Sequence, residues 1–244
     1  MSALAQEASW PAPSCVHAWV SGRVGGVSAA LYSTLNLAAH VGDEPHAVAE
    51  NRRRLAASLR LPSKPNWLTQ VHGSRVVDLD EPWSGPADGA VSGRAGVVCA
   101  VLTADCLPVL LADRTGNRVG IAHAGWRGLA CGVLEAVVAA MGTPPAELLV
   151  WLGPAIGPRA YEVGDDVRAA FVDSGAGAAS AFHPNERGRW QADLYALARM
   201  RLTRLGVAAI YGGGSCTYSE PEQFFSHRRE APCGRMASLI WLGD

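Results

Sequence analysis

The chain has 244 residues, and 49% of them are hydrophobic, which is enough apolar material for one continuous core. Lys and Arg (21) balance Asp and Glu (22), so the sequence lacks the charge excess of a nucleic-acid or membrane-surface binder, and a small substrate fits better. No run reaches about 18 uninterrupted apolar residues and no leader-like segment opens the chain, so we expect a cytoplasmic protein without membrane contact. The six cysteines show no CxxC spacing and are expected to be reduced thiols.

The predicted elements begin after residues 1–15, which we expect to be frayed, and residues 16–244 are expected to form a single catalytic domain. A short strand is predicted at 16–21, and helical spacing of apolar residues with Pro45 in the first turn predicts a helix at 44–59. Further strands are predicted within 96–106, 107–117, 118–128, 148–158, 207–211 and 236–242, and helices at 129–141, 163–172 and 192–205. The Gly/Ala/Ser stretch 174–181 is expected to be a mobile joint.

This interspersion of helices and strands excludes an all-helical or all-β protein. The chain also lacks a regular alternation of strand and helix and a GxGxxG motif after a strand, so a doubly wound parallel sheet is not expected. We therefore expect mixed sheets.

Two histidines and one cysteine, His72, Cys106 and His123, each stand at the end of an apolar run that is expected to be a buried strand. Each has an ordinary explanation by itself: a hydrogen-bonded histidine, a small core cysteine, or a glycine turn with Trp126 packed beneath it. Their coincidence at three strand ends favours a shared metal site. Zinc held by three protein ligands keeps one position open, which is typical of catalytic rather than structural zinc.

Two further residues are candidates for the chemistry. Asp105 interrupts an apolar run, and because burying a lone carboxylate is costly, it must be either paired or functional. Arg127 lies near the predicted start of a helix, where free N–H groups and the helix dipole attract phosphate or carboxylate.

The remaining candidates for substrate binding have weaker support. Asn36 is equally well explained as an ordinary turn residue, and Tyr161 and Glu162 as a surface strand end. His40 shares its loop with Asn36, and Arg228 follows an aromatic pair that is more often core.

Several ordered segments together carry a family resemblance over nearly everything from Gly25 to Leu242. They are GVSAALYSTLNLAAHVGDEPHAVAENRRRL, TQVHGSRVV, ADGAVSGRAGVVCAVLTADCLPVLLAD, VGIAHAGWRGLACGVLEAVV, LGPAIGPRAYEVGDDV, CTYSEPEQFFSHRRE and GRMASLIWL. In these segments the chain resembles the YfiH family, also called the laccase-domain or multicopper polyphenol oxidase-like family. The zinc ligands of that family fall on His72, Cys106 and His123.

The resemblance implies an α+β fold with mixed β-sheets flanked by helices, and a cytoplasmic enzyme that is a monomer or weak homodimer. It also implies that phosphate cleaves adenosine, inosine, guanosine or methylthioadenosine, with adenosine deamination as a side activity. Two residues depart from the family pattern: His227 stands where similar proteins often carry Tyr, and Cys233 where Thr is common. These departures bear on substrate preference more than on metal binding.

For the phosphorolysis that the resemblance implies, we expect zinc to orient the nucleoside and Arg127, with Arg228, to hold inorganic phosphate. Deamination would instead use Asp105 to move protons, although the HxE and PCxxC signature of zinc deaminases is absent. Copper-dependent phenol oxidation has weaker support, because the chain has seven histidines and no HxH pair.

A second kind of hydrolysis and a purely structural role for the metal both stay open. Zinc-assisted amide hydrolysis of a cell-wall muramyl precursor needs the same open coordination position. A structural zinc module would need a fourth ligand, for which Cys216, Asp105 and His40 are the candidates.

Overall fold

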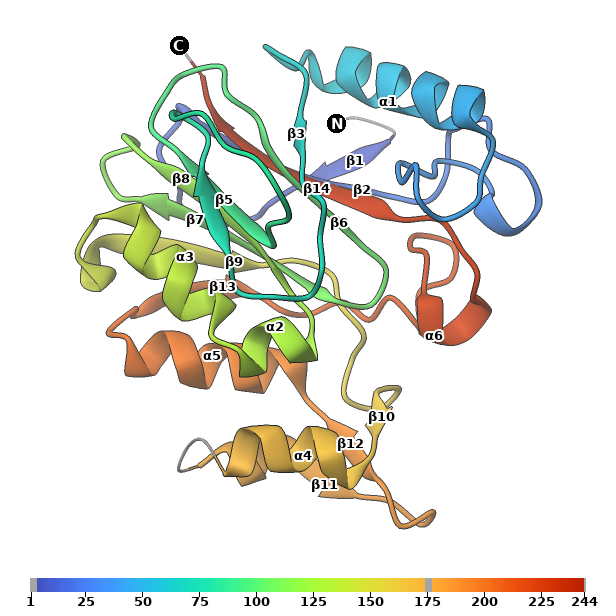
Figure 1. Ribbon diagram of the computed structural model, residues 1–244, viewed down its shortest axis with the longest axis vertical. Helices are drawn as coiled ribbons and strands as arrows, with labels where there is room; N and C mark the ends of the chain where they lie inside the picture. The colour runs from blue at the N-terminus through green and yellow to red at the C-terminus, as the bar shows by residue number, and fades with distance from the viewer. Residues whose placement is uncertain (1–3, 174–176, 244) are drawn as a thin grey trace.

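Two large sheets packed face to face form the body of the computed structural model, which describes residues 4–173 and 177–243 (Figure 1). The five-stranded sheet contains, in spatial order, β1 (Ala5–Glu7), β2 (Val16–Ser21), β14 (Met236–Leu242), β6 (Cys99–Thr103) and β3 (Asn66–Trp67). The six-stranded sheet contains β13 (Ala209–Gly212), β9 (Leu148–Leu152), β7 (Leu107–Asp113), β8 (Val119–Ala124), β5 (Gly89–Ser92) and β4 (Val76–Asp78). Both sheets are mixed, because β3–β6, β4–β5 and β9–β13 are parallel pairs and the other pairs are antiparallel.

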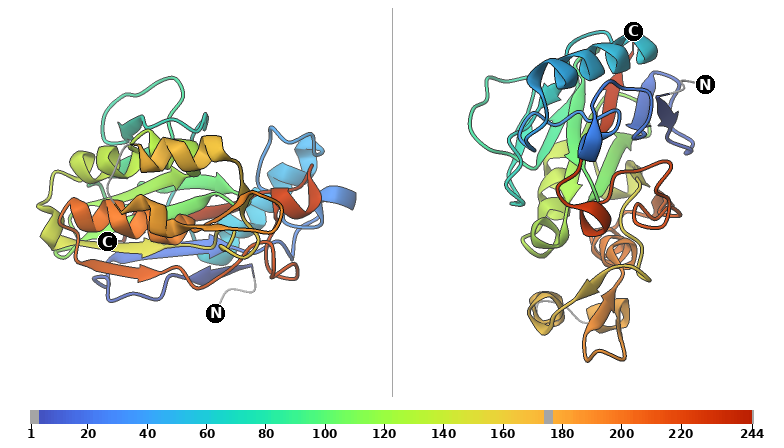
Figure 2. Two further views of the ribbon diagram at one scale, coloured as in Figure 1. Left: turned by 90° about the horizontal axis from the view of Figure 1, so that it is seen from below. Right: turned by 90° about the vertical axis from the view of Figure 1, so that its right-hand side faces the viewer.

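Helices cover the outer faces of the two sheets, and a smaller sheet forms a lobe below them (Figures 1 and 2). The helices are α1 (Pro45–Leu59), α2 (Trp126–Ala130), α3 (Val133–Met141), α4 (Asp165–Val172), α5 (Leu194–Arg204) and α6 (His227–Glu230). Short 3₁₀ turns lie at Ala30–Tyr32, Pro145–Glu147 and Ala178–Ala181. The small sheet contains β10 (Glu162–Val163), β12 (Trp190–Ala192) and β11 (Phe182–Pro184), and it lies beside α4.

The alternation of side chains along each strand explains this layering. On β7, Val109 and Leu111 pack into the core beneath α3 and α5, whereas Leu110 points the other way, into the core between the sheets. On β6, Val101 joins that inter-sheet core, and Leu102 packs on the side of α1. Because these strands are buried on both faces, their sequences are continuous apolar runs.

The α+β fold with mixed sheets flanked by helices is confirmed. Strands β2 and β14 coincide with the predicted strands, and α1 begins one residue later than predicted. The predicted helix 129–141 is instead two helices, because Gly132 between them adopts a left-handed φ of 90° that a continuing helix cannot accommodate.

The expected frayed start is corrected for the described part of residues 1–15. Ala5–Glu7 form β1, which pairs antiparallel with β2, and Ala5 is buried beside Leu37 and Leu239. Apolar contact and strand pairing together hold this segment on the sheet. Of the predicted mobile joint, residues 174–176 lie outside the described residues, and Ala178–Ala181 form a 3₁₀ turn.

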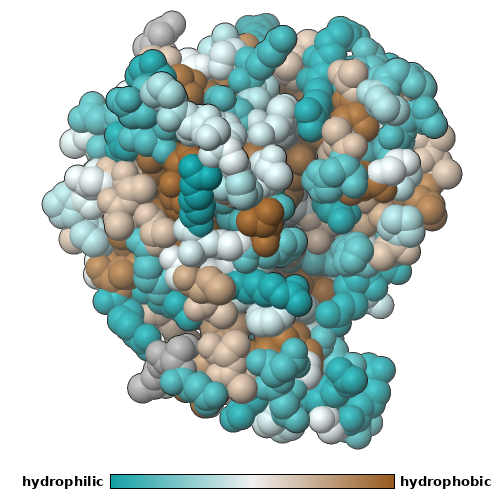
Figure 3. Space-filling view, viewed as in Figure 1, coloured by the Kyte–Doolittle hydropathy of each residue, from teal (hydrophilic) through white to brown (hydrophobic). Residues whose placement is uncertain are grey.

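The chain passes from one sheet to the other between β6 and β7, and residues 104–106 form the corner. The adjacent end of β8 and the loop between β3 and β4 lie at this corner, so distant segments meet there. Among the described residues, no helix combines the length and apolar character needed to span a membrane. The face shown in Figure 3 carries hydrophilic and hydrophobic residues side by side.

Candidate metal centre

His72, Cys106 and His123 converge at the corner between the two sheets. One ligand atom from each of them lies within 4.8 Å of the others. The Cys106 sulfur is 3.9 Å from His72 Nε2, and the two imidazole rings lie 4.7 Å apart between centroids in an edge-to-face arrangement. The structure therefore brings together the three residues that the sequence singled out.

The three ligands reach the corner from different kinds of segment. His123 lies within β8 on the same side as Ile121, so its ring projects toward the inter-sheet core, and Cys106 directly precedes β7. His72 was expected at a strand end, and this is corrected: it is exposed in the loop between β3 and β4, with a left-handed φ of 61°. A non-glycine residue in this conformation carries backbone strain, which is common at functional sites.

The donor set fits a single borderline metal ion. A tetrahedral zinc ion with Zn–N of about 2.0 Å and Zn–S of about 2.3 Å separates the two ligand atoms by about 3.5 Å. The observed distance of 3.9 Å between Cys106 and His72 needs only a small contraction. None of the candidates for a fourth protein ligand (His40, Asp105 and Cys216) belongs to the group among the described residues.

Asp88 orients two of the three ligands, and sequence reasoning missed it. Its Oδ1 accepts hydrogen bonds from His123 Nδ1 (2.8 Å) and from the backbone N–H of His72 (2.9 Å). Its Oδ2 accepts from the N–H groups of Val71 (3.1 Å) and Gly73 (2.7 Å). Because the carboxylate only accepts, His123 Nδ1 donates to it, which leaves Nε2 as the nitrogen that would bind a metal once its own proton is lost.

Cys106, His123 and Asp88 stabilise one another's charged forms. Burial opposes ionisation of Cys106, but the charge and hydrogen bonds of His123 and His72 outweigh it and lower the pKa of the thiol to about 6. Burial also disfavours the His123 cation, but Cys106 and Asp88 outweigh it and raise its pKa to about 9. Burial likewise opposes ionisation of Asp88, and hydrogen bonds from His123, Gly73 and Val71 still lower its pKa. The metal-free site therefore favours a thiolate, the form that binds metals.

Space beside the ligands is tightly limited on one side and open on the other. A Cβ added to Gly125 would lie 2.8 Å from the Cys106 sulfur and 3.3 Å from the His72 ring. On the open side lies a cavity of about 190 Å³. It is lined by His40, Gln70, His72, Leu102, Thr103, Ala104, Cys106, His123, His227 and Arg235.

The cavity wall carries no carboxylate among these lining residues. Arg235 donates to the carbonyl oxygens of Cys233 and Gly234, and its charge is one of the causes that lower the pKa of His40, after burial. The hydroxyl of Thr103 is buried without a hydrogen-bond partner in the described part of the chain. Of the residues predicted to bind substrate, His40 lines this cavity. Arg235 and Thr103 also line it, and the sequence did not single them out because an isolated Arg or Thr carries no signal of its own.

A second group of predicted residues lies around Tyr161. The side chain of Tyr161 is buried, which raises its pKa, and the charges of Cys106, Arg228, Asp105 and Arg127 also act on its hydroxyl. The Arg228 guanidinium lies 5.4 Å from the centre of the Tyr161 ring and donates to the carbonyl oxygen of Glu162. The Arg127 guanidinium is exposed over the Trp126 ring.

Asn36 is not brought to the cavity. It is fully buried, with Nδ2 donating to Ala38 O and Asp43 Oδ2. Its Oδ1 accepts from the N–H groups of Ala38 and Arg235. Its side-chain amide therefore holds loops together, and the structure does not bring Asn36 to the cavity beside the three ligands.

The Glu162 carboxylate is likewise engaged elsewhere. It accepts from Asn185 Nδ2 at 2.7 Å and pairs with Arg187 at 3.0 Å, both in the lower lobe. Its contribution near the site is its carbonyl oxygen, which anchors Arg228.

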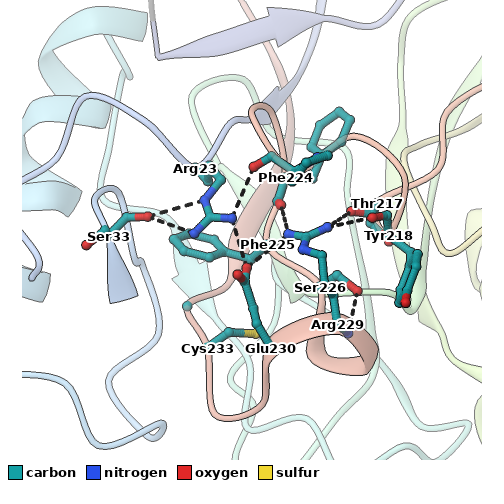
Figure 4. Close-up of polar contacts among 12 residues, drawn as sticks. Arg23, Ser33, Thr217, Tyr218, Phe224, Phe225, Ser226, Arg229, Glu230 and Cys233 are labelled. Carbon is teal, nitrogen blue, oxygen red and sulfur yellow. Dashed lines mark hydrogen bonds and ion pairs between the residues drawn. The ribbon is translucent and has the colours of Figure 1, made fainter. Parts of the chain in front are cut away.

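Residues 216–235, which contain α6 and are called the α6 segment below, form one wall of the site. Arg229 donates to the carbonyl oxygens of Thr217, Tyr218 and Phe224, and Glu230 pairs with both Arg229 and Arg23 (Figure 4). Arg23 also donates to the Ser33 carbonyl and lies 4.8 Å from the centre of the Phe225 ring. This network fixes the segment that carries His227 and Arg228.

Asp105 lies in the corner itself and contacts the α6 segment. Its Oδ1 accepts from the Thr217 hydroxyl and its Oδ2 from the backbone N–H of Arg228, both at 2.6 Å. It was expected to be either paired or functional, and it is paired.

The fold and this site define a protein in which a His–Cys–His group that could hold a metal ion lies at the junction of two mixed sheets. The chain belongs to the multi-copper polyphenol oxidoreductase laccase family, whose model matches residues 17–243. The family resemblance drawn from the motifs is thereby confirmed.

Close relatives support the same placement. A purine nucleoside phosphorylase of Pseudomonas aeruginosa is 57% identical over 236 residues, covering 96% of this chain and 97% of the relative. The purine nucleoside phosphorylase YfiH of Escherichia coli is 54% identical over 235 residues, covering 96% of each chain. The crystal structure of a Neisseria meningitidis protein is 49% identical with a TM-score of 0.93, covering 98% of this chain and 99% of that one.

Proposed function

We propose that this chain is a zinc-dependent purine nucleoside phosphorylase that acts on adenosine, inosine, guanosine or methylthioadenosine. The observation that carries the proposal is the convergence of His72, Cys106 and His123 on a cavity, with no fourth protein ligand in their group among the described residues. The names of the Pseudomonas and Escherichia relatives supply the reaction class.

Zinc suits the donor set because one thiolate and two imidazoles are ligands that it prefers. When bound, it supplies positive charge and an open coordination position. Among residues 4–173 and 177–243, the three ligands form the one group of His, Cys, Asp and Glu that could hold a metal. A phenol oxidase with several coppers would need further clusters, so this count supports zinc chemistry over laccase chemistry.

The proposed reaction joins phosphate to the sugar. A phosphate oxygen attacks the anomeric carbon, the bond from that carbon to the purine nitrogen breaks, and the purine leaves with its electron pair and takes up a proton. Products are the free purine base and the sugar 1-phosphate.

Two arginines are suited to the phosphate. We assign phosphate binding to Arg127, whose guanidinium lies over the Trp126 ring, together with Arg228, whose guanidinium lies over the Tyr161 ring. Burial raises the pKa of the Tyr161 hydroxyl, and the positive charges of both arginines act on that hydroxyl in the opposite direction. We assign the nucleoside to the cavity lined by His40, His227 and Arg235, while Glu162 contributes by holding Arg228 through its carbonyl oxygen.

The test is incubation of the zinc-loaded protein with inosine and phosphate. Phosphate-dependent formation of hypoxanthine and ribose 1-phosphate is expected, and its absence for all four nucleosides would reject the proposal. Cys106→Ser should abolish turnover, and Cys131→Ser, at an exposed cysteine, should not.

The same assay distinguishes the competing reactions by their products. Conversion of adenosine to inosine without phosphate consumption would indicate deamination. Release of an amino acid from a muramyl peptide, again without phosphate, would indicate amide hydrolysis. Activity on phenols that requires copper and is absent with zinc would favour the oxidase.

A further inference from the structure

We propose that Asp105 is a positioning residue, which couples the corner bearing Cys106 to the α6 segment, and that it does not transfer protons. This inference rests on the proposed metal site, and it assigns to Asp105 a role different from the acid–base role expected from sequence. It makes one carboxylate responsible for the placement of both a metal ligand and a wall of the cavity.

Both carboxylate oxygens of Asp105 are engaged by protein donors, and the residue lies outside the cavity lining. Each carboxylate oxygen accepts one hydrogen bond of 2.6 Å, from the Thr217 hydroxyl and from the Arg228 backbone N–H. The residue is 9% exposed, Thr217 is fully buried, and Asp105 is absent from the cavity lining. A proton-transfer group must reach the reacting atoms directly or through one water, and these contacts point Asp105 toward α6 instead.

The backbone of Asp105 is held as firmly as its side chain. Its φ is 85°, a left-handed value that needs support from the surrounding structure. Its carbonyl oxygen accepts from the N–H of Ile156 at 2.9 Å. Because Cys106 is the next residue, these contacts set the direction in which the ligand sulfur leaves the corner.

The other end of this link is the α6 segment. The Arg23–Glu230–Arg229 network fixes the segment against the loop that contains Ser33 (Figure 4). His227, which precedes the Arg228 amide in the chain, lines the cavity. Asp105 is therefore the hydrogen-bonded bridge between this anchored segment and Cys106.

Two substitutions separate positioning from proton transfer. Asp105→Asn preserves the shape and both hydrogen bonds, since the amide oxygen can accept from Arg228 N–H and the amide nitrogen can donate to the Thr217 oxygen. Asp105→Ala removes both bonds and leaves buried donors unpaired. Positioning predicts that Asn behaves like the parent protein and Ala does not, whereas acid–base catalysis predicts that both variants lose turnover.

The first measurement is made on metal-free protein and needs no activity. Hydrogen exchange at the Arg228 amide should be accelerated at least about tenfold in Asp105→Ala and less than about threefold in Asp105→Asn, because only the Ala variant lacks an acceptor for that N–H. Unchanged exchange in the Ala variant would overturn the link between Asp105 and α6.

The second measurement uses cobalt(II), whose thiolate charge-transfer absorption reports the geometry around Cys106. Asp105→Ala should alter this band and weaken cobalt affinity by about tenfold or more, the usual effect of losing an outer partner of a ligand. Asp105→Asn should leave both unchanged, and the pH profile of kcat/KM should keep its shape. Loss of affinity or a changed profile in the Asn variant would overturn the proposal.

The matched control is Asp113→Ala at the opposite end of β7. Asp113 is also buried, and it accepts hydrogen bonds within its own turn, from Thr115 and from the Asn117 N–H. Its loss should leave the cobalt band and Arg228 exchange unchanged. Failure of nucleoside cleavage would reject the proposed function while leaving exchange and cobalt spectra to decide the role of Asp105.

Discussion

Asp88 orients His72 and His123 because both of its carboxylate oxygens accept hydrogen bonds from the segments that carry them. In Asp88→Asn, the amide oxygen can serve His123 Nδ1, but the amide nitrogen then faces the N–H groups of Val71 and Gly73, which are also donors. The reverse orientation deprives His123 of its acceptor. We expect zinc affinity to fall by about 10–100-fold, measured by titration against a chromophoric chelator.

Asp193→Asn is a suitable comparison for this substitution. Asp193 caps α5 by accepting from the Ala196 N–H, and asparagine caps a helix equally well. Zinc affinity should therefore stay unchanged in this variant. Equal affinity of Asp88→Asn and the parent would show that Asp88 does not orient the ligands.

Cys106 should be alkylated at lower pH than an ordinary thiol. Its neighbouring imidazoles outweigh burial and lower its pKa to about 6, so the thiolate predominates above pH 6. In metal-free protein, iodoacetamide labelling of Cys106 should rise through about pH 6 and level off near about pH 7.5, where a free cysteine of pKa about 8.5 is still mostly protonated. Mass spectrometry of the labelled peptides across this range of pH measures the rise.

Zinc provides the control for that experiment. Saturating zinc should protect Cys106 and leave labelling of the exposed Cys131 unchanged. A Cys106 rate that rises only above about pH 8, as for an ordinary thiol, would contradict the thiolate.

The three candidate ligands could be predicted from the sequence. Each has an ordinary structural explanation by itself, but a metal site is the one explanation that accounts for all three residues at the ends of apolar runs. Asp88 could not, since an aspartate before a glycine reads as an ordinary turn, and only the fold shows that two ligand segments meet there. Asn36 shows the reverse error: its residue type permits substrate contact, yet its neighbours use every polar atom.

At the scale of elements, α1 supports the loop that carries His40 through one buried side chain. Asn51 of α1 is fully buried, accepts from the Val27 N–H and donates to Ser28 Oγ and to the carbonyl oxygens of Thr34 and Asn36. Asn51→Ala leaves several of these groups unpaired and should lower the free energy of unfolding by at least about 2 kcal/mol. Urea denaturation measures the loss as a lower midpoint at unchanged slope.

Glu50→Ala, at the position directly before Asn51, is the control variant for this loss of stability. Glu50 pairs with Arg53 and Arg54 on the solvent side of α1, where ion pairs contribute little. Its replacement should leave the urea midpoint nearly unchanged. A comparable loss in both variants would mean that the buried hydrogen bonds of Asn51 do not set the effect, since alanine favours the helix at both positions.

Elements with a strong local signal were predictable and short ones were not. The apolar runs of β2 and β14 and the spaced apolar face of α1 identify them without tertiary information. Strands β3, β10 and β12 contain two or three residues each, too few for any period, and exist because neighbouring strands pair with them. The division between α2 and α3 depends on Gly132, which the apolar pattern spans without interruption.

At the scale of the whole molecule, metal binding should stabilise the fold, because the ligands join three separate segments. At a zinc concentration about 100 times its dissociation constant, mass action adds about 2.7 kcal/mol, which for a chain of this size raises Tm by about 5–10 °C. Calorimetry with and without a chelator measures this shift. Cys106→Ser should show little or no rise, and an equal rise in that variant would place the zinc elsewhere.

The corner between β6 and β7 places the ligands where two stacked sheets meet, and the same strands continue directly into the apolar layer between them. A slight slide of one sheet over the other would move Cys106 relative to His72, although no residue near the ion had changed. Interior side chains such as Val101 and Leu110, which pack between the two sheets, therefore help to set the distances between the candidate ligands. In this architecture, a substitution deep in the interior can move the candidate metal ligands relative to one another without replacing any of them.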